Sequence, residues 1–444
     1  MTEGKIIKSI IIYAIPLILG NFMQQLYSTV DSFVVGNYVG ATALAAVGAS
    51  GQLTYFLIAF CLGASAGGGI LISQFYGAKS YDELHHVIHN MLGIAVVLGL
   101  VSTVVGVAFC PQLLRAMGTP EDMMPEAVLY LRIYFGGMIF MTFYNMLAAI
   151  LNAVGNSTKS LQYLVVSSLV NIALDFLLIC GFGMGVEGAA IATVISQGVS
   201  SILAFRYLAK VDAPYRVVFR DISLDKYWAM RVVRIGLPAA IQNAVISFSN
   251  ILIQTGVNAY GTNVVAGFSA YMKVDGFNIL PILSFSMAAT TFVGQNIGAG
   301  KRKRAFQGAA MIFVINLCYT LMMTAIMLGF DTQIISAFSK EPEVITSGVM
   351  CIWALAPFYS VLGVIHSLAG ALRGTGDTMG PMAIILISLC LFRVIWIWTM
   401  TSRIDGVMGV YLTYPTSFVL GAVLMVIYVL FKYHRSKQKK EKLW

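Results

Sequence analysis

The sequence predicts an all-α polytopic membrane protein with twelve transmembrane helices in two six-helix lobes. Three observations lead to this fold class: the composition, the long apolar segments and an internal repeat. Hydrophobic residues make up 58% of the 444 residues and charged residues only 11%, whereas soluble domains typically carry about 25% charged residues. The apolar segments are also too long for the strands of a membrane barrel. The composition therefore excludes an ordinary soluble domain.

Twelve segments are long enough to cross a bilayer, which takes roughly 20 residues of helix. We expect spans at residues 9–36, 44–75, 87–110, 125–152, 161–181, 188–209, 231–258, 264–296, 306–330, 345–372, 381–401 and 408–432. An even number of spans places both termini on the same side of the membrane.

Basic residues gather on the side of the termini, for example in the run 301–304 and in the tail 433–444. The opposite side carries only Arg115, Arg132, Lys340 and Arg403. The positive-inside rule therefore predicts a multi-pass protein of the plasma membrane with both termini in the cytoplasm. The same distribution explains the net charge of +9 by topology and lipid contact, without a nucleic-acid partner.

A charged connection divides the chain into halves. We expect an N-terminal six-helix lobe at residues 1–209, a cytoplasmic connection at 210–230, a C-terminal six-helix lobe at 231–432 and a basic cytoplasmic tail at 433–444.

The two halves repeat each other in sequence. SQFYGAK at 73–79 returns as GQNIGAG at 294–300, and LNAVGNS at 151–157 returns as LRGTGDT at 372–378, both at an offset of 221 residues. Pro16 returns as Pro238 at an offset of 222. Six spans per half make this a parallel repeat, and such two-lobed proteins alternate access by rocking one lobe against the other. The repeat therefore favours a transporter.

Four polar residues of the N-terminal half fall at one predicted depth. Asp31 lies near the outer end of the first span, Asn171 and Asp175 share one face of the fifth, and Thr193 lies in the sixth. These oxygen-bearing groups suit a desolvated Na⁺, a shared proton, or both. A purely structural hydrogen bond between helices is the alternative for each acid, although acids at membrane depth are seldom without a function.

Other polar residues could extend this site. Gln24 and Tyr27 share a helix face with Asp31. In the C-terminal half, the 221 offset aligns Asp31, Asn171, Asp175 and Thr193 with Leu252, Phe392, Trp396 and Tyr414. The cation site is therefore expected in the N-terminal lobe alone. Lys273, Asp275 and Arg393 are the main charges inside the other lobe, and for Lys273 and Asp275 a structural role and a cavity role stay equally open.

These residues resemble the prokaryotic multidrug and toxic compound extrusion (MATE) transporters. The resemblance covers nearly the whole chain and includes IPLILGNFMQQLYSTVDSFVVG at 15–36 and the GQNIGAG turn. It implies an essential acid in the first span that faces an Asn-x-x-x-Asp and a Thr, which here are Asp31, Asn171, Asp175 and Thr193. It also implies that Tyr27, Tyr130 and Asn145 surround the site and that the first span bends near Pro16.

The resemblance implies a secondary antiporter that exports cationic amphipathic compounds in exchange for inward H⁺ or Na⁺. The wider superfamily includes flippases of lipid-linked sugars, so a flippase of an amphipathic lipid is the alternative; a channel would need no division into lobes. No Walker-type motif is present, so we expect no ATP-driven pump and no enzyme. We expect a monomer that needs no cofactor besides the coupling ion, with small organic cations and membrane lipids as partners.

Overall fold

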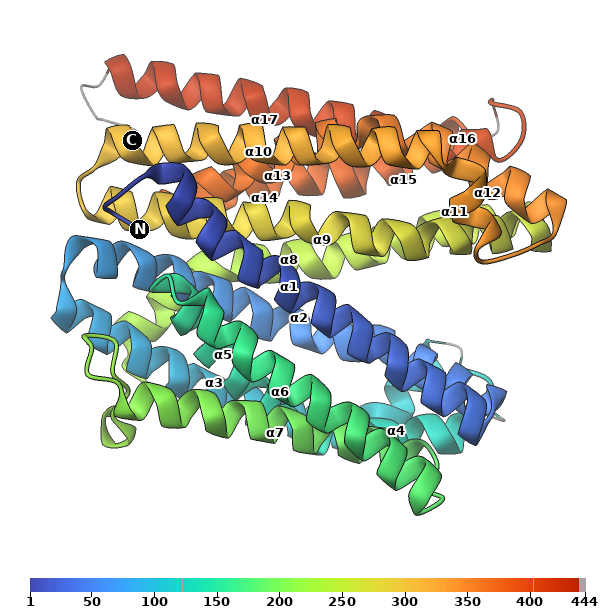
Figure 1. Cartoon of the computed structure of the whole chain (residues 1–444), viewed down its shortest axis with the longest axis horizontal. Coiled ribbons are helices and arrows are strands. Elements are labelled where there is room, and N and C mark those ends of the chain that lie inside the picture. Colours follow the sequence, from blue (N-terminus) through green and yellow to red (C-terminus); the bar gives the residue numbers. More distant parts are fainter. Residues whose placement is uncertain (118, 122, 402, 439–444) are drawn as a thin grey trace. The chain divides into compact units, whose positions relative to one another are not determined.

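The computed structural model describes residues 1–117, 119–121, 123–401 and 403–438, without the side chains of residues 41, 49, 52, 56 and 435–438. The last residues of the predicted basic tail, 439–444, lie outside this range. Helices make up the regular structure of the described residues, and no strand occurs among them (Figure 1).

The N-terminal half contains α1 (Ile6–Val34), η1 (Val35–Val39), α2 (Ala41–Ala78), α3 (Tyr81–Ala116), α4 (Met124–Gly136), α5 (Met138–Ala153), α6 (Ser157–Asp175), η2 (Phe176–Gly181), α7 (Val186–Lys210) and η3 (Phe219–Asp221). The C-terminal half contains α8 (Lys226–Asn258), α9 (Thr262–Gly298), α10 (Arg302–Gly329), α11 (Asp331–Ser336), α12 (Pro342–Leu355), η4 (Ala356–Phe358), α13 (Tyr359–Gly374), α14 (Met379–Leu386), η5 (Ile387–Leu391), α15 (Phe392–Thr399), α16 (Met408–Tyr411) and α17 (Thr413–Gln438).

Eleven helical segments among the described residues are long and apolar enough to cross a membrane. The expected span at 125–152 forms a twelfth, as α4 and α5 joined at a bend of 50°. Large apolar side chains on the outer faces of these helices remain exposed in the isolated chain, among them Val104, Leu169 and Trp398, as expected for surfaces that meet lipid. The predicted twelve-span, all-α membrane fold is confirmed.

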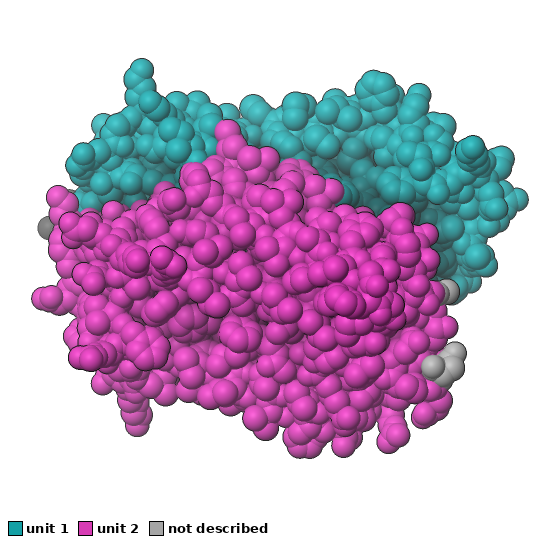
Figure 2. Space-filling model, turned by 60° about the horizontal axis from the view of Figure 1, so that its bottom comes forward, with its two compact units in different colours: residues 1–14, 242–444 teal, residues 15–241 magenta. Residues whose placement is uncertain are grey.

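The chain forms two compact units, residues 1–14 with 242–444 and residues 15–241 (Figure 2). The units divide inside α1 and α8, close to Pro16 and Pro238. They therefore differ at their edges from the predicted lobes at 1–209 and 231–432, because the opening part of each of these two helices packs with the other half of the chain.

Contacts of the N-terminal residues explain why they belong to the unit of residues 242–444. The Arg304 guanidinium donates hydrogen bonds to the carbonyl oxygens of Met1, Glu3 and Gly4 at 2.8 to 3.4 Å. Inside α1, the Tyr13 hydroxyl lies 3.0 Å from the Thr291 hydroxyl of α9.

Glycines let the first part of α8 approach α2 closely. A Cβ atom at Gly67 of α2 would lie 2.4 Å from the carbonyl oxygen of Val232, and a Cβ atom at Gly236 of α8 would lie 2.3 Å from the carbonyl oxygen of Gly63. Small residues at such crossings allow two membrane helices to pack backbone against backbone. This crossing fixes residues 226–241 to the unit of residues 15–241.

The helices η2 and η5 are π turns, which insert one extra residue into a helix. The halves are offset by 221 residues where the helices begin, since the side chain of Asn156 caps α6 as the side chain of Asp377 caps α14. In the C-terminal half the π turn comes before Arg393, whereas in the N-terminal half it comes after Asn171 and Asp175. Between the two turns the offset must therefore be 222.

The burial pattern agrees with this corrected register. Asn171 and Arg393 are both buried, whereas Phe392 is not. The repeat counterpart of Asn171 is therefore Arg393 instead of Phe392, and that of Asp175 is Ile397 instead of Trp396. In α1 and α8 the offset of Pro16 and Pro238 also holds at the acid, so Asp31 corresponds to the buried Ile253 and not to Leu252.

We predict that Gly67→Ala destabilises the protein by about 1–3 kcal/mol, because the added methyl group forces the α2–α8 crossing apart. Thermal unfolding of the purified protein measures this effect. Gly69→Ala is the matched control, since its Cβ atom would meet nothing closer than 3.9 Å and alanine favours a helix by up to about 1 kcal/mol. An equal response of the two variants would contradict the tight crossing.

Candidate functional site

The acids predicted in the first and fifth spans come together inside the unit of residues 15–241. Asp31 of α1 is 9% exposed and Asp175 of α6 is fully buried. The carboxylates lie close enough for their charges to interact, and both charges reach the hydroxyls of Tyr27 and Tyr130. The structure thus joins four of the predicted site residues in one cluster.

Local helix geometry places these two acids. In α1 and in α6 the α-helix gives way to a π turn within a few residues after the acid. The two π turns η1 and η2 pack against each other, and η1 also packs against α7. A π turn changes the direction of the carbonyl groups and often accompanies a functional site. Sequence periodicity carries no signal for these turns.

Several polar atoms of this site have no hydrogen-bonding partner in the described part of the chain. They are Oδ1 of Asp31, both carboxylate oxygens of Asp175, and both Oδ1 and Nδ2 of Asn171. Asn171 lies one helical turn before Asp175 and is 1% exposed. A buried polar group without a partner costs about 1–3 kcal/mol, and more when it is charged. These oxygens fit a proton or a hard cation such as Na⁺.

The other residues predicted near the site differ in how closely they are tied to it. The side chain of Gln24 hydrogen-bonds Tyr27. Thr193 is buried on α7, which packs against α6; its hydroxyl donates to the Ala189 carbonyl oxygen at 3.0 Å and keeps its lone pairs. The amide of Asn145 donates to the Met141 carbonyl oxygen of its own helix at 2.8 Å. Tyr134, which the sequence did not single out, stacks on Tyr130 at 5.9 Å.

The charges predicted in the C-terminal half do not form one site. Lys273 is exposed, and its ammonium lies 6.0 Å from the ring of Phe338. Asp275 accepts a hydrogen bond from the Tyr359 hydroxyl of α13. Among the described residues, Lys273 and Asp275 make no ion pair with each other. Asp275 thus has a partner on a neighbouring helix, as its structural interpretation predicts.

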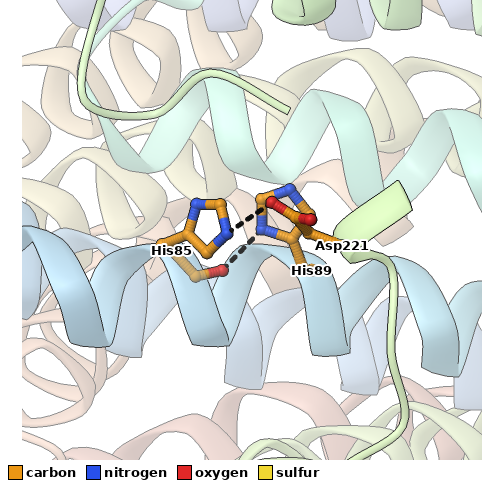
Figure 3. A group of neighbouring side chains, drawn as sticks. All are labelled: His85, His89 and Asp221. Atoms are coloured by element: carbon orange, nitrogen blue, oxygen red, sulfur yellow. Dashed lines mark hydrogen bonds and ion pairs between the residues drawn. The ribbon is translucent and has the colours of Figure 1, made fainter. Parts of the chain in front are cut away.

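A second group of titratable side chains lies where the connection meets α3 (Figure 3). His85 and His89 stand one turn apart on α3, and Asp221 reaches them from η3, with 3.1 Å between His85 Nε2 and Asp221 Oδ2. The ligand atoms of the three residues lie within 4.8 Å of one another, which is close enough for a metal ion.

The hydrogen bonds of His89 argue against such a metal site. Its Nε2 accepts from the Val218 backbone N–H at 2.9 Å, so its Nδ1 carries the proton and donates to the His85 carbonyl oxygen at 2.7 Å. A metal at either nitrogen would break a buried hydrogen bond. Asn90 continues the same contact, since its Oδ1 accepts from the Asp225 N–H at 2.6 Å. We therefore interpret the group as an attachment of the connection to α3.

Comparisons with known proteins agree with the fold and the repeat. The MatE family model matches the chain twice, at residues 16–177 and 238–399. The probable multidrug resistance protein YoeA of Bacillus subtilis is 30% identical over 439 residues, which cover 97% of this chain and 95% of that protein. The probable multidrug resistance protein NorM of Thermotoga maritima is 26% identical, over 95% of this chain and 92% of that protein.

Solved structures give the same fold. The crystal structure of a MATE protein in the bent conformation has a TM-score of 0.92 at 23% identity, and the match covers 99% of this chain and 98% of that chain. The two family matches each contain one of the prolines Pro16 and Pro238 and start 222 residues apart (238 minus 16), as the parallel repeat requires. The chain therefore belongs to the MatE family of multidrug efflux transporters, whose members are membrane transporters and not enzymes.

Proposed function

We propose that this protein is a secondary antiporter that exports cationic amphipathic compounds in exchange for inward H⁺ or Na⁺. The observation that carries the proposal is the set of carboxylate oxygens of Asp31 and Asp175 that are buried without a hydrogen-bonding partner in the described residues. Acids at membrane depth usually mark an ion path. Asn171 and Thr193 would complete the oxygen ligands for Na⁺, whereas a proton would need only the two carboxylates.

The coupling follows from the charge of this site. With both acids ionised, the site attracts an organic cation; once H⁺ or Na⁺ has bound, the attraction is lost and the cation leaves. An ion that moves inward through a membrane potential releases about 2.3 kcal/mol per charge per 100 mV. That free energy supports a concentration gradient of about 50-fold for the exported compound.

The aromatic side chains around the acids support an organic cation as substrate. Tyr27, Tyr130 and Tyr134 all interact with the charge of Asp31, and a flat aromatic cation gains from contact with such rings. A flippase for lipid-linked substrates is less well supported, because the groups left without partners in this unit are mainly acidic. The relatives named above are called multidrug resistance proteins, which also favours small molecules.

The membrane arrangement that accompanies this function is also a proposal. We place the chain in the plasma membrane as a monomer with both termini in the cytoplasm, on the strength of the basic residues that gather there. Pro16 removes one backbone hydrogen bond from α1 and lies next to the division between the units. We infer that α1 bends at this proline when the lobes alternate.

We expect Asp31→Asn to lower the efflux of an organic cation such as ethidium at least about tenfold, because a neutral amide binds neither the coupling ion nor the dye. Dye efflux from energised cells measures the effect, and size-exclusion chromatography of the purified variant verifies folding. Asp405→Asn is the control, since Asp405 is exposed in the loop before α16. Efflux at the wild-type rate in the Asp31 variant would refute the coupling role.

The coupling ion can be identified in proteoliposomes that carry separate Na⁺ and pH gradients. We expect one gradient, or both, to drive dye uptake by the wild type, and Asp175→Asn to abolish the driven part while passive leakage stays the same. Dye movement that follows the dye's own gradient and ignores both ion gradients would instead indicate a channel.

A further inference from the structure

A buried guanidinium occupies the repeat position of Asn171 in the C-terminal half. Arg393 is 3% exposed and follows directly on the π turn η5. Its Nε donates to the Ser417 hydroxyl at 2.9 Å and its Nη1 to Oδ1 of Asn250 at 3.4 Å. The guanidinium also lies over the ring of Tyr414, 4.6 Å from the ring centroid.

The surroundings of Arg393 repeat the candidate site of the other half with its charge reversed. The repeat places the aliphatic side chains of Ile253 and Ile397 where the other half has Asp31 and Asp175. The contact residue Tyr414 is the counterpart of Thr193 at the offset of 221. Corresponding backbone positions thus carry carboxylates in one half and a guanidinium in the other.

No carboxylate of the described residues forms an ion pair with Arg393. The acid whose charge acts on it is Asp275, but two phenols hold that carboxylate. The Tyr359 hydroxyl donates to Asp275, and the Tyr271 hydroxyl lies 2.6 Å from the Tyr359 hydroxyl. Buried arginines are almost always paired with an acid, so a guanidinium whose hydrogen bonds go to neutral groups calls for an explanation.

The geometry of Arg393 suits the recognition of a planar anion. Tyr414 and Phe418 cover its face, with ring centroids at 4.6 and 5.5 Å, while its edge makes the hydrogen bonds. Within the described residues these bonds use Nε and Nη1, which leaves Nη2 to donate further. An arginine edge binds a carboxylate with two parallel hydrogen bonds. One positive charge matches a carboxylate better than a phosphate dianion.

We propose that Arg393 forms an anion-recognition site in the C-terminal lobe, which binds the carboxylate of an organic zwitterion or anion. This inference rests on the proposed export function and extends its substrate class from cations to compounds that also carry an acidic group. Ser417 and Asn250 orient the guanidinium, and Tyr414 stacks on the bound compound's recognition partner, the guanidinium face.

Two dyes that differ only in one carboxyl group test this site: rhodamine 110, the free acid, and rhodamine 123, its methyl ester. Fluorescence anisotropy with the purified protein gives the dissociation constant of each dye. We expect the wild type to prefer the free acid and Arg393→Gln to lower the ratio of free-acid to ester affinity about tenfold or more. Asp275→Asn should raise that ratio, because it removes a negative charge that acts on Arg393.

Arg403→Gln, at an exposed position in the same half, should leave the ratio unchanged. Arg393→Lys keeps the charge but loses the planar edge, so it should lower the ratio severalfold and provides the test if the glutamine variant does not fold. An unchanged ratio in both Arg393 variants, or an equal loss for both dyes, would overturn the proposal. Its failure is distinct from that of the antiport function, which is read from ion-driven efflux of the ester and its loss in Asp31→Asn.

Discussion

Burial of ionisable side chains among lipid-facing helices is the constraint on which both halves of this protein depend. A charge in such surroundings is retained only with a partner or a function. Asp275 has its partner in Tyr359. Asp31 and Asp175 instead keep carboxylate oxygens that no described side chain satisfies. The same physical cost thus distinguishes an acid that joins two helices from acids that are free to bind an ion.

The fold and the main site residues could be predicted from the sequence because they rest on strong local patterns. Apolar segments of spanning length predicted the membrane helices, and the bend between α4 and α5 explains how one expected span became two helices. The acids Asp31 and Asp175 were conspicuous because carboxylates are rare in such segments. That their charges interact could only be expected from their depth until the helices were placed.

The register of the repeat could not be predicted, since it depends on single extra residues in π turns. No apolar period marks η2 or η5, and a constant offset therefore aligned Asn171 with Phe392. Tertiary hydrogen bonds were equally hidden: a lone histidine pattern gave no sign that His89 would accept from Val218, 129 residues further along the chain. Such contacts depend on how the connection returns to α3, and a single sequence contains no direct signal for that path.

The reversed charge of the two halves has a physical reason within each half. A guanidinium at the position of Asn171 would pair with Asp175 one turn away and with Asp31, and paired carboxylates stay ionised without any added cation. Such a pair would remove the attraction for H⁺ or Na⁺ that antiport needs. In the C-terminal half, Ile253 and Ile397 replace those acids, so Arg393 remains without a carboxylate in contact among the described residues. Duplication supplied one backbone frame twice, and the two halves could then specialise in ions of opposite sign only because neither kept both charges.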